Sequence, residues 1–244
     1  MDVDAVLFDL DDTLFDHRHA RLIGMETLRR LEPGLARFPL AQLDRAFERL
    51  LSDIHVRLVL TGKISPPESR ELRMTKLLAE YRIDLPKRRI RELVDRRLEA
   101  YRRHRRAVPG AAALLRGLRA SGTAIAVVTN NLISEQQEKL RVTGLDELVD
   151  HLVCSEEVGV LKPDPRIFRV ALKRAGARAR QSVMVGDSWD SDVRGAAQLG
   201  VWPVWFHRDS RPLPRSPPAG HLRSFRPLAH ARSVVLAGGP PRRG

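Results

Sequence analysis

Short apolar runs recur along this chain, and each is followed at once by acidic, hydroxyl or glycine residues. The first covers residues 4–10, and later ones cover 124–129, 182–186 and 201–206, with a weaker run at 151–155. The runs alternate with stretches in which apolar residues have helical spacing, and several of these stretches end near a glycine. Strands that alternate with helices imply right-handed crossovers, and therefore a parallel sheet. The sequence thus predicts an α/β fold whose parallel sheet is covered on both faces.

The alternation stops between about residues 16 and 107. Apolar residues there recur at intervals of three and four, as in Leu43, Phe47, Leu50, Leu51 and Ile54. Helix-breaking residues interrupt the pattern near Pro33-Gly34, Gly62, Pro66-Pro67 and Pro86. We therefore expect an all-helical insert of about four helices. The predicted division is a core domain at 1–16 and 107–237 with the insert at 17–106.

The C-terminal part has a different composition. Prolines crowd the segment after Arg208, which predicts loop or disorder. Residues 220–236 regain enough apolar character for one edge strand and a short helix. Residues 238–244 are expected to be a disordered tail.

Charge is the most unusual feature of the composition. The chain has 43 Lys and Arg against 30 Asp and Glu, a net charge of +13. Such a balance favours anionic partners, and a non-catalytic basic nucleic-acid-binding module is the alternative from another functional class. Aromatic residues make up only 5% and do not alternate with the basic cluster at 102–106, so a base-stacking surface is not indicated. We expect an arginine-rich solvated surface and no nucleic-acid partner.

Cysteine content and hydropathy indicate where in the cell the protein is expected. Cys154 is the only cysteine, so neither an internal disulfide nor a thiolate metal site can form. No apolar run approaches the roughly 20 residues of a membrane-spanning helix. We expect a cytoplasmic protein without a membrane partner, and the sequence leaves open whether it is a monomer or a homodimer.

The first apolar run ends in two carboxylates at alternate positions, Asp9 and Asp11. Side chains alternate along a strand, so both are expected to project the same way at the carboxyl edge of the sheet, where ligands bind in such folds. Their repulsion favours a bound cation or a retained proton. The motif alone is equally compatible with a solvated acidic turn.

A second acidic cluster, at 186–192, follows another apolar run and contains Asp187, Asp190 and Asp192. Carboxylates from two strand ends can hold a hard divalent cation. Mg²⁺ suits the pattern because it accepts a few carboxylates, keeps water ligands and binds phosphate oxygens. The spacing differs from that of a twelve-residue calcium-binding loop.

Groups able to bind phosphate follow two other runs. Thr129 ends one of them, and Asn130 and Asn131 then begin a predicted helix whose N-terminal amides favour an anion. Lys162 precedes a further helix in a proline-rich loop. Each is weak evidence alone, and their order and combination carry the argument.

Taken together, these motifs resemble the haloacid dehalogenase superfamily, in its phosphatase type. The pattern hhhhDxDxT fits Asp9–Thr13, hhhT ends at Thr129, the Lys-Pro pair is at Lys162, and hhhhGDxxxxD ends in Gly186–Asp192. The resemblance covers residues 4–206. It implies a Rossmann-like, doubly wound core, and the helical insert resembles the family's C1-type cap of subfamily IA. The chain looks most like its nucleotidase and N-acylneuraminate-9-phosphatase-like members.

The resemblance implies a reaction as well as a fold. Asp9 would be the nucleophile that forms an aspartyl-phosphate, and Asp11 would be the general acid and base. Thr13 would position Asp11. Because Asp11 is present, phosphate esters are favoured over the carbon-halogen bonds that dehalogenases of the same superfamily cleave; a phosphomutase shares every core residue and stays open.

The remaining motif residues would bind substrate and metal. Thr129, Asn130 and Lys162 would contact the phosphoryl group. Mg²⁺ would be held by Asp9, the backbone carbonyl of Asp11 and Asp187. Asp192 would bind Mg²⁺ through water or orient Lys162, with Asp190 as the less favoured alternative. The partner would be a small phosphorylated molecule.

Specificity in this family lies in the cap, which begins with His17, Arg18 and Arg21. These residues could meet an anionic leaving group. We favour the simpler expectation that they form an exposed helix start.

Overall fold

The computed structural model describes residues 3–208 and 220–237, which belong to two compact units. One unit combines Met1–Asp16 with Arg106–Gly244, and the other is His17–Arg105. Most of the proline-rich stretch after Arg208 and the expected disordered tail at 238–244 lie outside the described residues. In the part that is described, no helix is both long and apolar enough to cross a bilayer.

The first unit contains a six-stranded parallel sheet. Its strands are β1 (Ala5–Phe8), β2 (Ala124–Thr129), β3 (His151–Cys154), β4 (Ser182–Gly186), β5 (Trp202–Phe206) and β6 (Gly220–Leu222). The spatial order is β3-β2-β1-β4-β5-β6, so the chain winds outward from β1 in both directions. This topology confirms the predicted doubly wound α/β class. All four residues of β1 are buried, as expected for a central strand covered on two faces.

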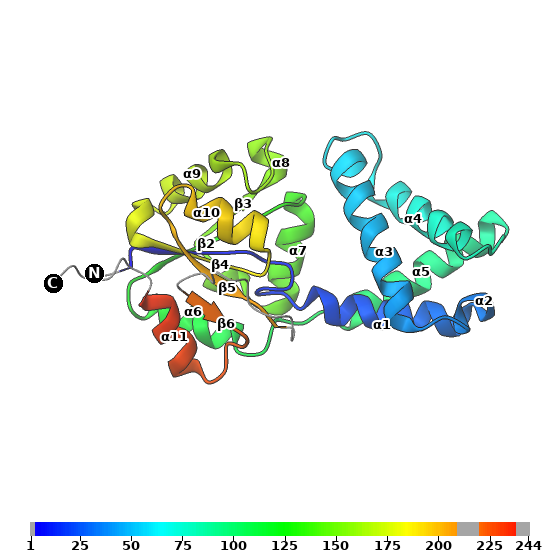
Figure 1. Ribbon diagram of the computed structural model, residues 1–244, viewed down its shortest axis with the longest axis horizontal. Helices are drawn as coiled ribbons and strands as arrows, with labels where there is room; N and C mark the ends of the chain where they lie inside the picture. The colour runs from blue at the N-terminus through cyan, green and yellow to red at the C-terminus, as the bar shows by residue number, and fades with distance from the viewer. Residues whose placement is uncertain (1–2, 209–219, 238–244) are drawn as a thin grey trace. The chain divides into compact units, whose positions relative to one another are not determined.

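Helices cover both faces of this sheet (Figure 1). Helices α6 (Ala111–Arg119) and α11 (Leu228–Leu236) lie on one face, and α9 (Pro165–Arg174) and α10 (Gly195–Ala197) on the other. Leu7 and Met184 pack with Phe168 in the core under α9. The remaining elements are α7 (Ile133–Thr143), α8 (Ser155–Val158), the 3₁₀ turns Asp146–Leu148 and Ala179–Gln181, and the π-type turn Trp189–Arg194.

Strand register brings the polar strand ends to one edge of the sheet. Phe8, the last residue of β1, pairs with Val127 on one side and Val185 on the other. The amide of Asp9 donates to the carbonyl of Val185 at 2.9 Å. Because all three strands are parallel, the residues that follow them emerge together.

The second unit is entirely helical among the residues described. Its elements are α1 (His17–Leu31), α2 (Pro33–Ala36), α3 (Leu40–Ile54), the π-type turn His55–Val59, α4 (Pro66–Glu80) and α5 (Lys87–Arg103). Leu28, Leu43, Phe47, Leu77 and Leu93 are in its own apolar core. Each of these side chains is at most 2% exposed, so the helices bury the stripe that their spacing predicts.

The expectation of an exposed helix start is wrong for Arg21. Its side chain is 3% exposed, and its guanidinium lies 2.7 Å from Asp44 and 3.0 Å from Glu48 on α3. Arg18, by contrast, is exposed. Arg21 is one helical turn further on, where α1 faces its neighbour, so packing between helices decides its burial.

The chain leaves the first unit and returns to it through paired backbone segments. Phe15 pairs with Ala107 in an antiparallel bridge, and the amide of Asp16 donates to the carbonyl of Arg106 at 3.0 Å. The Asp16 carboxylate is buried and accepts hydrogen bonds from Arg106 at 2.9 Å and Arg208 at 2.8 Å. We refer to these contacts as the Asp16 junction.

Candidate active site

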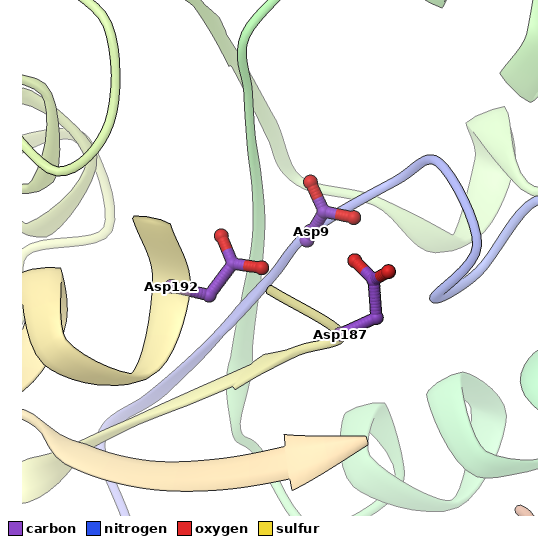
Figure 2. A group of neighbouring side chains, drawn as sticks. All are labelled: Asp9, Asp187 and Asp192. Atoms are coloured by element: carbon purple, nitrogen blue, oxygen red, sulfur yellow. The ribbon is translucent and has the colours of Figure 1, made fainter. Parts of the chain in front are cut away.

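Three carboxylates converge at the carboxyl edge of the sheet (Figure 2). Asp9 follows β1, Asp187 follows β4, and Asp192 comes from the π-type turn after β4. One oxygen from each lies within 4.8 Å of the others. Asp9 and Asp192 are buried, whereas Asp187 keeps exposed surface. The two acidic motifs therefore form one cluster.

Lys162 lies against this cluster. Its Nζ is 2.7 Å from Asp9 Oδ1 and 2.7 Å from Asp192 Oδ1, and it donates to the carbonyl of Val128 at 2.7 Å. The ammonium is buried and so depends on these partners; removing one partner of a buried ion pair typically costs about 3–5 kcal/mol. Lys162 thus joins the first motif to the last.

Asn130 fixes the backbone of Lys162. Its side-chain oxygen accepts from the Lys162 amide at 2.7 Å, and its side-chain nitrogen donates to the Lys162 carbonyl at 3.0 Å. Both ends of the Asn130 amide are therefore used within the protein. A direct contact between Asn130 and phosphate stays a prediction.

Crowding of like charges perturbs the site. Burial raises the pKa of Asp9 to about 7; the ammonium of Lys162 lowers it, whereas Asp192 and Asp11 raise it again. The pKa of Asp187 is also raised, first because the surrounding protein partly desolvates its carboxylate, although the side chain keeps exposed surface, and then because Asp9 and Asp192 are near. Burial lowers the pKa of Lys162, but the two adjacent carboxylates outweigh burial and raise it. The cluster favours an additional positive charge.

The donor set fits a hard divalent cation. Three carboxylates provide oxygen ligands, and one Lys162 ammonium leaves net negative charge. Asp9 Oδ2 is buried and has no hydrogen-bond partner among the described residues. Such an atom is costly to bury unless a cation or another donor satisfies it.

Local backbone geometry explains the glycine of the last motif. A Cβ atom on Gly186 would collide with the Asp192 carboxylate. That carboxylate also accepts from the amide of Ser188 at 3.0 Å, which fixes its direction. Asp190 instead forms an exposed ion pair with Arg194 at 2.9 Å. The structure thus brings Asp192, and not Asp190, to the cluster.

Asp11 has partners that the sequence analysis missed. Lys139 Nζ lies 2.7 Å from both Asp11 oxygens, and Gln136 Nε2 donates to Asp11 Oδ2 at 3.1 Å. The same Gln136 nitrogen donates to Thr129 Oγ1 at 2.6 Å. The only sequence signal is that Gln136 and Lys139 are three residues apart, and so share a face, on the helix after Thr129.

Two other predicted features can be located in the structure. The Thr13 hydroxyl is buried and has no hydrogen-bond partner among the described residues, so it forms no hydrogen bond to Asp11, and a role for Thr13 in positioning Asp11 stays a prediction. Helix α7 begins at Ile133, later than expected from Asn130. The Ile133 amide donates to Glu156 and the Leu132 amide to Asn131, each at 2.8 Å. These two amides are therefore already satisfied.

Comparison with known proteins gives a consistent family. Residues 3–200 match the family model described as a haloacid dehalogenase-like hydrolase. A glyceraldehyde 3-phosphate phosphatase of Pyrococcus furiosus is 30% identical over 84% of this chain and 80% of its own length. The phosphoserine phosphatase of Thermus thermophilus is 43% identical over 51% of this chain, and the pyrimidine 5'-nucleotidase YjjG of Escherichia coli is 42% identical over 44%. The matches to these last two span about half of each relative, 49% and 48%.

Solved structures share the fold. YfnB of Bacillus subtilis, whose crystal structure contains magnesium, aligns with a TM-score of 0.70 at 24% identity over 96% of this chain and all of its own. A dehalogenase captured as an intermediate complex aligns with a TM-score of 0.76 at 21% identity, over 97% of this chain and 99% of its own. Both likenesses concern the arrangement of the backbone.

Proposed function

The chain belongs to the haloacid dehalogenase-like hydrolases, and from that premise we propose that it is a Mg²⁺-dependent phosphatase acting on a small phosphate monoester. The observation that carries the proposal is the convergence of Asp9, Asp187 and Asp192 with Lys162. A nucleophile, a cation site and a fixed positive charge are what phosphoryl transfer requires. The names of the three relatives found by sequence, two phosphatases and one nucleotidase, support the same class.

The proposed reaction has two displacements. In the first, an Asp9 oxygen bonds to phosphorus while the bond to the leaving oxygen breaks, and Asp11 gives that oxygen a proton. In the second, Asp11 takes a proton from water, whose oxygen bonds to phosphorus as the bond to Asp9 breaks. Inorganic phosphate leaves and both carboxyl groups return to their first state. The covalent aspartyl-phosphate divides one difficult step into two easier ones.

The other residues would bind the phosphoryl group and the metal. We assign Thr129 and Lys162 to the phosphoryl oxygens, and we assign Asp9, Asp187 and the Asp11 carbonyl to Mg²⁺. Asp192 would act through water or by orienting Lys162. Bound Mg²⁺ would supply positive charge that offsets the crowded carboxylates and the phosphoryl oxygens.

The helical unit His17–Arg105 would serve as the cap that selects the leaving group. The relatives named above differ in substrate, from an amino-acid phosphate to a nucleotide and a triose phosphate. The substrate is therefore sought by a phosphate-release screen. It should include phosphoserine, nucleoside monophosphates, sugar and triose phosphates and phosphoglycolate, each with and without Mg²⁺.

Two substitutions test the catalytic assignment with the best substrate from that screen. Asp9→Asn and Asp11→Asn should each lower turnover at least roughly a thousandfold while far-UV circular dichroism shows that the fold survives. Asp190→Asn is the matched control, because Asp190 belongs to the same acidic stretch but pairs with Arg194 at the surface.

Other outcomes would contradict the proposal in distinct ways. Wild-type turnover in Asp9→Asn would exclude the covalent intermediate. Transfer of phosphate between positions of a sugar without release would indicate a phosphomutase. Failure of the wild type to release phosphate from any monoester with Mg²⁺ present would refute phosphatase activity altogether.

A further inference from the structure

Helix α7 buries polar side chains against the core. Its buried residues are Gln136, Lys139 and Leu140, so two of the three are polar. A helix that covers a sheet normally buries an apolar stripe, and lysine is rarely buried without a partner. Burial of an amide or an ammonium group costs free energy unless hydrogen bonds replace water. The partners of Gln136 and Lys139 therefore deserve a functional explanation.

Gln136 connects two residues of the candidate site. Its Nε2 atom has two hydrogens, and the acceptors Thr129 Oγ1 and Asp11 Oδ2 lie 2.6 and 3.1 Å away. Its Oε1 atom has no hydrogen-bond partner among the described residues, so the two acceptors orient the amide. Because Thr129 Oγ1 accepts from Gln136, its own hydroxyl proton remains available for another acceptor. A phosphoryl oxygen is such an acceptor.

Lys139 restrains the Asp11 carboxyl group. Nζ lies 2.7 Å from each carboxylate oxygen, so the contact is symmetric. The Lys139 ammonium also lies 5.5 Å from the centre of the Phe15 ring, and its side chain is 9% exposed. Because Gln136 and Lys139 are on adjacent turns, one helix face fixes both the rotation and the distance of Asp11.

We propose that Gln136 and Lys139 are positioning residues for the phosphoryl transfer proposed above, on which this inference rests. Lys139 holds Asp11 where it exchanges a proton with the leaving oxygen. Gln136 links Asp11 to Thr129 and directs the Thr129 hydroxyl toward the phosphoryl group. Both act through these neighbours and neither touches the substrate.

The Lys139 contact is tested through the dependence on the leaving group. Lys139→Met should lower kcat/KM at least about tenfold for an alkyl phosphate, whose departing oxygen needs a proton in the first displacement. For p-nitrophenyl phosphate, which departs without protonation, kcat/KM should fall less than about threefold. Lys139→Arg should restore most of the alkyl phosphate activity. Lys173→Met, at an exposed lysine on α9, is the matched control.

A purely structural role for Lys139 makes the opposite prediction. Equal losses of kcat/KM with both substrates, or an alkyl phosphate kcat/KM equal to that of the wild type, would overturn the assignment. Lys139→Gln removes the positive charge but keeps a hydrogen-bond donor in the buried position. Its own ratio of alkyl to aryl kcat/KM decides the question if Lys139→Met does not fold.

The Gln136 contact is tested by binding, which needs no turnover. Calorimetric titration of inorganic phosphate in the presence of Mg²⁺ should give an affinity about tenfold weaker for Gln136→Met than for the wild type. Gln137→Met, at the exposed neighbouring position, should match the wild type. Equal affinities for Gln136→Met and the wild type would refute the link to Thr129. A wild type that binds phosphate but hydrolyses no monoester would refute the proposed function alone.

Discussion

Gly186 leaves the space into which the Asp192 carboxylate turns. Any larger residue would displace a group that contacts Lys162 at 2.7 Å. The glycine is thus required by a close approach of side chain to backbone, and not by a positive φ angle.

Gly186→Ala should therefore damage both the fold and the site. Overpacking of this kind lowers the free energy of unfolding by about 1–3 kcal/mol. The shift of Asp192 should also weaken Mg²⁺ binding, measured by calorimetry, by roughly tenfold or more. Gly117→Ala, on α6 where the nearest atom to a new Cβ is 3.9 Å away, is the control and should not be destabilised. An unchanged Mg²⁺ affinity in Gly186→Ala would show that Asp192 does not contribute to Mg²⁺ binding.

The sequence identifies single residues unevenly. Four site residues follow predicted strands or precede a predicted helix: Asp9, Asp187, Asp192 and Lys162. The strands are parallel and end at the same edge of the sheet, so the topology alone predicts that these residues lie together. The contacts of Gln136 and Lys139 could not be predicted in this way, because the face that α7 buries depends on the rotation of the helix about its own axis. The burial of Arg21 was missed for the same reason.

Among the elements, the connection through the Asp16 junction carries a charge that is sensitive to pH. Burial opposes ionisation of Asp16, but hydrogen bonds from Arg208 and Arg106 outweigh it and hold its pKa below the ordinary value. A lowered carboxyl pKa stabilises the folded state above the unfolded-state pKa. That contribution disappears as pH falls through the folded-state pKa.

Asp16→Asn should thus lower the free energy of unfolding at pH 7 by about 1–3 kcal/mol in urea titrations. The difference from the wild type should shrink when the titrations are repeated at successively lower pH below the ordinary carboxyl pKa of 3.8, where the unfolded chain takes up a proton at Asp16 before the folded protein does. Asp53→Asn, which removes an exposed helical ion pair with Arg57, should change stability by less than about 0.5 kcal/mol. A deficit for Asp16→Asn that is independent of pH would show that charge is not the cause.

Elements are easier to predict than their detailed ends. The fold class and the strands follow from apolar runs of the right length, and even the weak run at 151–155 forms β3. The π-type turns at His55–Val59 and Trp189–Arg194 have no sequence signal. Neither does the hydrogen bond from Trp205 Nε1 to the Asp187 carbonyl, because it depends on how β5 and the following loops pack.

For the whole molecule, the net charge of +13 should affect substrate capture. A positive field raises the encounter rate with an anionic ester, and salt screens it. We expect kcat/KM to fall roughly threefold to tenfold between low salt and 0.5 M KCl, with kcat less affected. Sucrose at matched osmolality serves as the control.

The same salt series distinguishes the rival interpretation of that charge. Steeply salt-dependent binding of DNA or RNA, in a protein without phosphatase turnover, would favour a nucleic-acid-binding module. A flat kcat/KM in an active enzyme would instead show that the arginines do not steer the substrate.

At the Asp16 junction the outgoing and returning segments are hydrogen-bonded to each other, with Phe15 opposite Ala107 in an antiparallel bridge. The start and finish of the intervening ninety or so residues are therefore fixed side by side by the sheet unit itself. A tight two-residue hairpin could close that gap, because such hairpins join antiparallel neighbours. The length and sequence of the inserted segment can therefore change during evolution without moving β1.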